Sequence, residues 1–328
     1  MIRSRFLFMA VVVLAAVVIV GGTGAGIMRH ILSRELPTND TQYFYIERGS
    51  GLLRTSYLAQ EKGLVSTRWH FMLAAQLLGM ERSLQAGEYE LGPSMSLRDV
   101  FDKIRQGERY FRRVAIPEGL SSKEVEVLLR QSFGLDTKGL VAPGEGTLLP
   151  DTYFYERGDQ ATSILKRMTG KQAELIAKLW DNRAPGLPFD TIDEALTLAS
   201  IVEKETAVAE ERAMVAAVFV NRLRKGMRLQ SDPTVIYGIT GGIALGRPIS
   251  RADLNATTPY NTYRVAGLPP TPIANPGRQS IAAVLNPADV PYLYFVADGT
   301  GGHAFATSLE DHNRNVARWR QFERKSRP

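Results

Sequence analysis

Two glutamates stand two residues apart in a run of apolar and small side chains, "ASIVEKETAV" at residues 199–208. Most enzymes that hydrolyse glycosidic bonds use a pair of carboxyl groups. Residues two apart on a helix point about 200° away from each other, so Glu203 and Glu205 cannot act as such a pair. The apolar residues predicted to surround Glu205 on one face are Leu198, Ile201, Val202, Val208 and Ala209. The pattern therefore predicts a desolvated Glu205 and places Glu203 toward the other side.

A desolvated carboxyl group could do useful chemistry. Burial disfavours its charged form and raises its pKa. A carboxylic acid that is still protonated near neutral pH can donate a proton to a leaving-group oxygen. The alternative is structural: Glu205 would only meet a lysine or arginine across a helix interface. Periodicity alone favours this structural role over the catalytic one.

Other kinds of catalytic site find little support in the sequence. The chain contains no cysteine, which excludes disulfides, thiolate catalysis, cysteine-ligated zinc and a lipoprotein anchor. No H-E-x-x-H or G-x-S-x-G motif is present, nor a phosphate-binding glycine loop with lysine. His303 and His312, close to Glu310 and Asp311, could ligate a metal, although a loop or helix-end role is favoured. We expect no metal and no organic cofactor.

Length and composition describe an ordinary globular protein with a membrane-directed N-terminus. The 328 residues suffice for about two domains. The net charge of +6 is not concentrated as in a nucleic-acid-binding protein, so no nucleic-acid partner is expected. Residues 6–28 contain no charged side chain and are long enough to span a bilayer. Arg3 and Arg5 predict that residues 1–5 stay in the cytoplasm.

The apolar stretch has two interpretations. An uncleaved single-pass anchor of residues 6–28 is favoured, and a cleaved signal peptide is the alternative. Both place the remaining chain outside the cytoplasm. We therefore expect the residues after this stretch to fold outside the cytoplasm.

The elements that must position Glu205 belong to an α+β fold in two parts. Residues 42–110 show a strand–helix–helix–strand pattern that resembles a LysM-like peptidoglycan-binding module. Residues 111–328 form a larger domain, strongly helical over about 160–183 and 191–224. From Met227 onward the chain has long loops rich in glycine, proline, tyrosine and asparagine, and such loops are uncommon unless they line a site. Tyrosines beside amides in these loops suit a sugar-binding groove, although packing is the more frequent role.

Several long motifs then resemble one family in the same order. They are "EGTLLPDTYFY", "LASIVEKETAVAEERAMVAAVFVNRLRKGMRLQSDPTVIYG", "YNTYRVAGLPPTPIANPG" and "PYLYFVADGTGGHAFATSLEDHN". They closely resemble the YceG-like endolytic murein transglycosylases, with Leu149 where that family commonly has an aromatic residue. The resemblance covers nearly the whole chain. It implies an enzyme that cuts peptidoglycan glycan strands internally, close to the membrane, and leaves 1,6-anhydro-muramyl ends.

The resemblance also implies roles for particular residues. The family's catalytic glutamate falls on the second glutamate of "EKET", Glu205, which would act as the single acid and base. The positions expected in the substrate groove are Glu203, Asn221, Gln230, Asp232, Tyr260 and Asn261. A hydrolytic glycosidase would need a second carboxylate, for which Asp232 and Asp151 are the candidates. A non-catalytic peptidoglycan-binding scaffold is the alternative of another class, and glycan-polymerising synthases are the expected protein partners.

Overall fold

The structure is a computed structural model that describes residues 9, 12, 14–15, 22–24, 26–36 and 40–326. The predicted cytoplasmic residues 1–5, and much of the predicted anchor at 6–28, lie outside this part of the chain. Within it, no helix combines the length and the apolar character that crossing a membrane requires. The anchor therefore stays a prediction.

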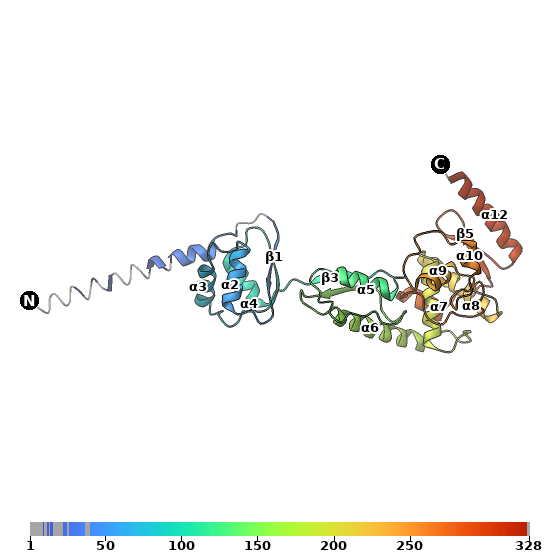
Figure 1. Ribbon diagram of the computed structural model, residues 1–328, viewed down its shortest axis with the longest axis horizontal. Helices are drawn as coiled ribbons and strands as arrows, with labels where there is room; N and C mark the ends of the chain where they lie inside the picture. Colours follow the sequence, from blue (N-terminus) through green and yellow to red (C-terminus); the bar gives the residue numbers. More distant parts are fainter. Residues whose placement is uncertain are drawn as a thin grey trace, which may run out of the picture. The chain divides into compact units, whose positions relative to one another are not determined.

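The described chain mixes helices with short strands, as the α+β prediction expects (Figure 1). In chain order the elements are β1 (Gln42–Ile46), α2 (Leu52–Glu61), α3 (Arg68–Leu77), β2 (Gly87–Leu91), α4 (Leu97–Gln106), β3 (Arg112–Ala115), α5 (Ser122–Gln131), β4 (Thr152–Tyr155), α6 (Ala161–Asp181), α7 (Ile192–Glu205), the 3-10 turn η1 (Ala209–Glu211), α8 (Arg212–Arg224), α9 (Asp232–Thr240), α10 (Arg251–Asn255), α11 (Arg278–Leu285), β5 (Tyr294–Ala297), β6 (His303–Ala306) and α12 (Leu309–Ser326). These strands pair two by two, as β1–β2, β3–β4 and β5–β6.

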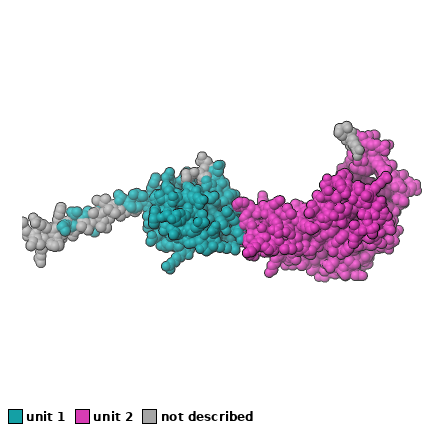
Figure 2. All heavy atoms as spheres, viewed as in Figure 1, with its two compact units in different colours: residues 1–112, 156–158 teal, residues 113–155, 159–328 magenta. Residues whose placement is uncertain are grey.

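The chain divides into two compact units, which Figure 2 colours separately. Unit 1 comprises residues 1–112 and 156–158, and unit 2 comprises residues 113–155 and 159–328. In unit 1, β1 pairs antiparallel with β2, and α2 and α3 connect the two strands. Phe71 lies at the centre of its core, with its ring 4.7 Å from that of Phe101 and 6.3 Å from that of Phe44. Unit 1 therefore contains a strand–helix–helix–strand order. Its likeness to a LysM module stays a prediction.

Unit 2 is built around a helix that is buried on every side over two turns. All residues of α7 from Ala195 to Val202 are buried, so this helix has no solvent-facing stripe over two turns. It packs against α8 and α11 in the larger core of the unit. Thr191 begins α7 with a capping box: its hydroxyl accepts from the Glu194 N–H, and the Glu194 carboxylate accepts from the Thr191 N–H. The N-terminal end of the helix is thereby held at a defined position.

The long helix predicted over about 191–224 is interrupted, and that prediction is wrong at this point. α7 ends at Glu205, and Thr206 is extended with φ −140°. The Thr206 hydroxyl accepts a hydrogen bond of 3.0 Å from the Val208 N–H, which offers the backbone an alternative to the helix. The chain becomes helical again in η1 and α8. Val208 and Ala209 therefore do not share a helix face with Glu205; it lies in the last turn of α7.

Unit 1 contains a buried carboxylate that generates a stability prediction. The side chain of Glu88 is only 1% exposed, and Arg112 binds it through Nε at 2.7 Å and through Nη2 at 3.0 Å. Arg157 approaches the same carboxylate to 3.6 Å. Removing one partner of a buried ion pair leaves the other charges uncompensated.

We expect Glu88→Ala to lower the free energy of unfolding of unit 1 by about 3 kcal/mol. Urea denaturation measures this through the fluorescence of Trp69, with Trp180 and Trp319 replaced by phenylalanine. Glu108→Ala is the matched control, because its carboxylate is 53% exposed and 4.0 Å from Lys103. Equal effects of the two substitutions would contradict the prediction.

Candidate active site

Glu205 lies at the C-terminal end of α7, and its carboxyl group is held by a serine hydroxyl. Ser231 Oγ donates a hydrogen bond of 2.5 Å to Glu205 Oε1. Ser231 is 1% exposed, and its backbone N–H donates to Thr262 Oγ1 at 2.9 Å. Because Ser231 occupies one carboxyl oxygen, the other oxygen, Oε2, is the one available to a ligand.

The surroundings of Glu205 raise the pKa of its carboxyl group. Burial is the largest cause, and the negative charge of Asp232 acts in the same direction. The hydrogen bond from Ser231 and the charges of His303 and Arg222 oppose it without reversing it. The last turn of a helix also disfavours a negative charge. These conditions favour a carboxyl group that keeps its proton near neutral pH.

The carboxyl group faces a cavity of about 450 Å³ in unit 2. Its lining combines five apolar side chains with six polar or charged ones. The lining residues are Glu205, Phe219, Arg222, Leu229, Gln230, Asp232, Tyr263, Phe295, Val296, His312 and Val316. They come from α7, α8, α9, β5, α12 and the loops before α9 and after α10, so the site exists only once these segments have folded together.

A strained turn precedes Ser231, which binds Glu205, and Asp232, which lines this cavity. Gln230 has a positive φ of 55°, a conformation that residues other than glycine rarely adopt and that is often found at functional sites. Ser231 follows it as the N-cap residue of α9, and Asp232 lies in the first turn, where the helix dipole favours a negative charge. Tyr263 donates a hydrogen bond of 2.7 Å from its hydroxyl to Asp232 Oδ1. This bond and burial raise the pKa of Tyr263, which keeps it a donor.

A buried arginine brings positive charge to the cavity without forming an ion pair with Glu205. Arg222 is 8% exposed. It donates from Nε to the carbonyl oxygen of Leu293 and from Nη1 to that of Leu229, both at 2.7 Å. Its guanidinium lies 5.2 Å from the ring centre of Tyr294. Backbone carbonyls thus hold the cation in place, and its field acts on the cavity.

Glu203 lies on another side of α7 and does not line the cavity. Its Oε2 accepts a hydrogen bond of 2.9 Å from the Gly277 N–H, just before α11, and its Oε1 is 4.0 Å from Arg212 Nη2. Its side chain is only 6% exposed. Both glutamates are therefore largely enclosed, and their neighbours distinguish them: Glu203 holds two helices together, whereas Glu205 faces a cavity.

The other predicted groove residues separate into two sets. Gln230 and Asp232 line the cavity with Glu205. Asn221 instead donates to the carbonyl oxygens of Val290 and Tyr292, at 2.8 and 3.1 Å, and fixes the segment before β5.

Tyr260 and Asn261 also serve the loops rather than the cavity. The Tyr260 hydroxyl is 2.8 Å from that of Thr271. Asn261 is fully buried, and its amide donates to the carbonyl oxygens of Ala256 and Leu254 at 2.6 and 3.1 Å. Their polar groups are occupied by the protein itself.

Sequence reasoning identified Asp232 but missed two other residues that act on Glu205 from outside its own helix. Neither Ser231 nor Arg222 stood out, because nothing in "NRLRKG" distinguishes the buried Arg222 from the exposed Arg224. His312 also lines the cavity, where its ring stacks on Tyr294 at 5.1 Å and burial lowers its pKa. His303 is 2.6 Å from Glu211 through Nδ1. The described residues include no cluster of three side chains able to hold a metal ion.

The two candidates for a second carboxylate lie in different places. Asp151 forms a salt bridge of 2.8 Å with Lys171 and accepts from the Thr152 N–H at the start of β4. It does not line the cavity, whereas Asp232 does.

Comparisons with known proteins agree on one family. The model of the YceG-like family matches residues 44–318. A protein of Bacillus subtilis named endolytic murein transglycosylase is 27% identical over 85% of this chain and 85% of its own length. A Streptococcus pneumoniae protein of the same name is 29% identical over 88% of this chain, which spans 61% of that protein. The crystal structure of a YceG-like protein from Listeria monocytogenes is similar with a TM-score of 0.53 and 29% identity, covering 84% of this chain and 99% of that one.

The raised pKa of Glu205 predicts that stability falls as pH rises. An unfolded glutamate titrates at about 4.3. Between that pH and the higher pKa of folded Glu205, the folded chain binds more protons than the unfolded chain, so the free energy of unfolding decreases with increasing pH. Glu205→Gln removes this titration and keeps an oxygen that can accept from Ser231.

We therefore expect Glu205→Gln to gain stability relative to the unsubstituted protein as the pH increases above about 4. Urea denaturation at several pH values measures the difference. Glu210→Gln, on the exposed turn η1, is the control for the loss of a surface charge from unit 2. A difference for Glu205→Gln that does not change with pH would contradict the prediction.

Proposed function

The chain belongs to the YceG-like family, and we propose that it is an endolytic lytic transglycosylase that cuts the glycan strands of peptidoglycan. The observation that carries this proposal is the Glu205 carboxyl group, with its raised pKa, facing a cavity inside the span that the family model matches. The names of the relatives from Bacillus subtilis and Streptococcus pneumoniae support the same substrate and reaction.

In the proposed first step, protonated Glu205 acts as general acid. It donates its proton to the oxygen of the bond between N-acetylmuramic acid and N-acetylglucosamine, and the bond from that oxygen to the muramyl anomeric carbon breaks. The N-acetylglucosamine end leaves as an alcohol, and the muramyl ring carries positive charge. Oε2 is the oxygen assigned to this transfer, because Oε1 accepts from Ser231. The raised pKa keeps the acid protonated until it is needed.

In the second step the same group acts as base. The Glu205 carboxylate takes the proton of the muramyl 6-hydroxyl, whose oxygen bonds to the anomeric carbon and closes a 1,6-anhydro ring. Glu205 ends protonated, as it began, and no water is consumed. One carboxyl group therefore suffices for the whole reaction.

The neighbours of Glu205 receive positioning roles. Ser231 fixes the orientation of the carboxyl group, and its hydrogen bond stabilises the anion that exists between the two steps. The positive charge of Arg222 stabilises the same anion. Asp232, held by Tyr263, maintains the proton on Glu205 in the resting enzyme and places negative charge beside the positively charged sugar ring.

The location of Asp232 keeps a hydrolytic reaction as the second candidate. A glycoside hydrolase would use Asp232 as nucleophile or base, with water as the acceptor. Asp151 is a poor candidate for that task because it pairs with Lys171 away from the cavity. The stereochemistry and identity of the product distinguish the two reactions.

The setting of the reaction is also part of the proposal. The apolar residues 6–28 would anchor the chain in the inner membrane, with residues 1–5 in the cytoplasm and the rest in the periplasm. The LysM-like residues 42–110 would bind glycan near the membrane. Glycan-polymerising synthases are the proposed partners, since this enzyme would cut strands that they produce.

We expect Glu205→Gln to slow the release of glycan fragments by at least about a hundredfold, because a positioned acid contributes factors of that size. Incubation of the purified protein with peptidoglycan and mass spectrometry of the released fragments measures this. Glu203→Gln is the matched control on the same helix and should retain cutting if it still folds. An active Glu205→Gln enzyme would contradict the assignment of the acid.

The same spectra decide between the reactions. Fragments with 1,6-anhydro ends are expected from the unsubstituted enzyme. Fragments with reducing ends would show hydrolysis and overturn the transglycosylase reaction. Binding without any released fragment would indicate a non-catalytic scaffold.

Two further substitutions should move the pH dependence in opposite directions. Activity needs protonated Glu205, so it declines as pH rises through that pKa. Ser231→Ala removes a bond that lowers the pKa, so the decline should move to higher pH and the maximal rate should fall. Asp232→Asn removes a charge that raises the pKa, so the decline should move to lower pH. Rates of fragment release across pH measure both shifts, and shifts in the same direction would contradict this account.

A further inference from the structure

Unit 1 exposes a row of large apolar side chains on one face of α3. Trp69, Leu73 and Leu77 are spaced four residues apart, which places them on one side of the helix. They are 61%, 46% and 61% exposed, respectively. The opposite face of α3 supplies Phe71, Ala74 and Ala75 to the core. An exposed apolar row of this kind on a folded unit marks an interaction surface.

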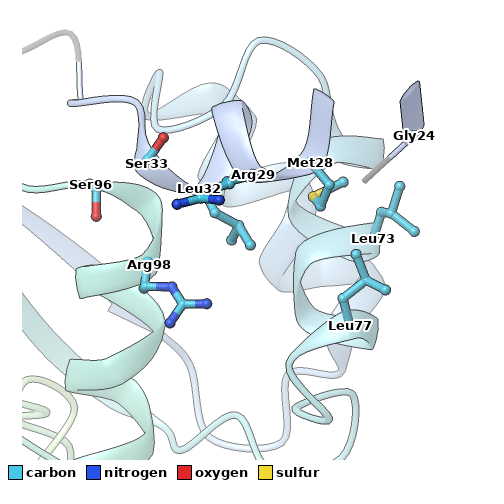
Figure 3. Close-up of a pocket in the computed structure, with 9 residues that line it drawn as sticks. All are labelled: Gly24, Met28, Arg29, Leu32, Ser33, Leu73, Leu77, Ser96 and Arg98. Carbon is cyan, nitrogen blue, oxygen red and sulfur yellow. The ribbon is translucent and has the colours of Figure 1, made fainter. Parts of the chain in front are cut away.

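Two residues of this row, Leu73 and Leu77, face two arginines across an open hollow (Figure 3). Leu73 and Leu77 line a hollow of about 970 Å³ together with Arg29 and Arg98, and no acidic side chain is among its described lining residues. Figure 3 shows Leu73 and Leu77 on one side of the hollow and the two arginines on the other. Trp69, the first residue of the row, also lies beside a cation, since the guanidinium of Arg68 is 5.0 Å from its ring centre.

The remaining wall of the hollow comes from the end of the apolar N-terminal stretch and the helical turn directly after it. Gly24, Met28 and Leu32 line the hollow, and residues 6–28 carry no charged side chain. Met28 and Leu32 also belong to the core of unit 1, where they are 6% and 9% exposed. The hollow is therefore bounded by the residues through which the apolar stretch joins unit 1.

From this combination we propose that the α3 face and the hollow bind the membrane surface, with an anionic phospholipid between the leucines and the arginines. The proposal rests on the membrane anchor proposed above. Arginine binds phosphate groups through two parallel hydrogen bonds, and leucine side chains suit acyl chains. Tryptophan is enriched where a membrane meets water.

A glycan is the less suitable occupant of this surface. Sugars are bound by flat aromatic faces with amides and carboxylates beside them, whereas the hollow offers three leucines, a methionine, two arginines, two serines and a glycine. The anionic lipid satisfies both the apolar and the cationic groups at once. Binding would keep unit 1 at the bilayer surface, where newly made glycan emerges.

The test uses the full chain in vesicles and the fluorescence of Trp69. Trp180 and Trp319 are replaced by phenylalanine, so that Trp69 is the only tryptophan. The vesicles contain phosphatidylglycerol and phospholipids brominated on the acyl chain near the carbonyl. We expect Trp69 to be quenched and its emission to shift to shorter wavelength. A chain that retains only Trp319, in unit 2, is the control for quenching that does not depend on this face.

Variants separate the face from the rest of unit 1. Leu73→Ser with Leu77→Ser should abolish the quenching of Trp69, whereas Leu53→Ser, equally exposed on α2, should not. Arg29→Ala with Arg98→Ala should weaken it in phosphatidylglycerol vesicles and have little effect in phosphatidylcholine vesicles. The control for this charge change is Arg54→Ala, an exposed arginine of α2.

The outcomes distinguish this inference from the proposals on which it rests. A chain that floats with the vesicles but leaves Trp69 unquenched would overturn lipid binding alone. A chain that does not float would overturn the anchor as well, and the release of glycan fragments tests the catalytic proposal independently. If soluble glycan fragments change the emission of Trp69 and brominated lipid does not quench it, lipid binding is overturned and the α3 face is assigned to glycan.

Discussion

The burial of one carboxyl group is the constraint on which the candidate site depends. A glutamate that loses contact with water is costly to ionise. Unit 2 creates this condition with α7, a helix that is buried on every side and ends at Glu205. The helix cannot continue, because Thr206 is extended and its hydroxyl binds the backbone of Val208. The carboxyl group therefore leaves the core at one defined point and faces the cavity from there.

Polar groups around Glu205 also stabilise its ionised form. Ser231 donates to one oxygen, while Arg222 contributes positive charge held by backbone carbonyls. Asp232 acts in the opposite direction and is itself held by Tyr263. The balance between these groups sets the pKa that a single acid and base would need in two successive steps. Gln230, with its positive φ, is part of that arrangement, since it directly precedes Ser231 and Asp232.

The two glutamates of "EKET" lie in one helical turn but have different surroundings. Glu203 accepts from the backbone before α11 and approaches Arg212, so it joins the helices that enclose α7. Glu205 accepts from Ser231 and faces the cavity. Their separation follows from helical geometry, in which residues two apart point in different directions. Burial alone does not distinguish them, since the Glu203 side chain is only 6% exposed.

Local patterns of the sequence determined the mixed α+β class and the position of α6, because apolar periodicity acts over a few residues. They also singled out Glu205, and the motifs around it indicated the family. The break after Glu205, the hydrogen bond from Ser231 and the buried Arg222 were decided only by the tertiary structure. So was the occupation of Asn261 by backbone carbonyls, which a loop composition rich in amides could not reveal. The physical reason is distance along the chain: Glu205 meets Ser231 across 26 residues, and no local pattern records which distant side chains a folded core will bring together.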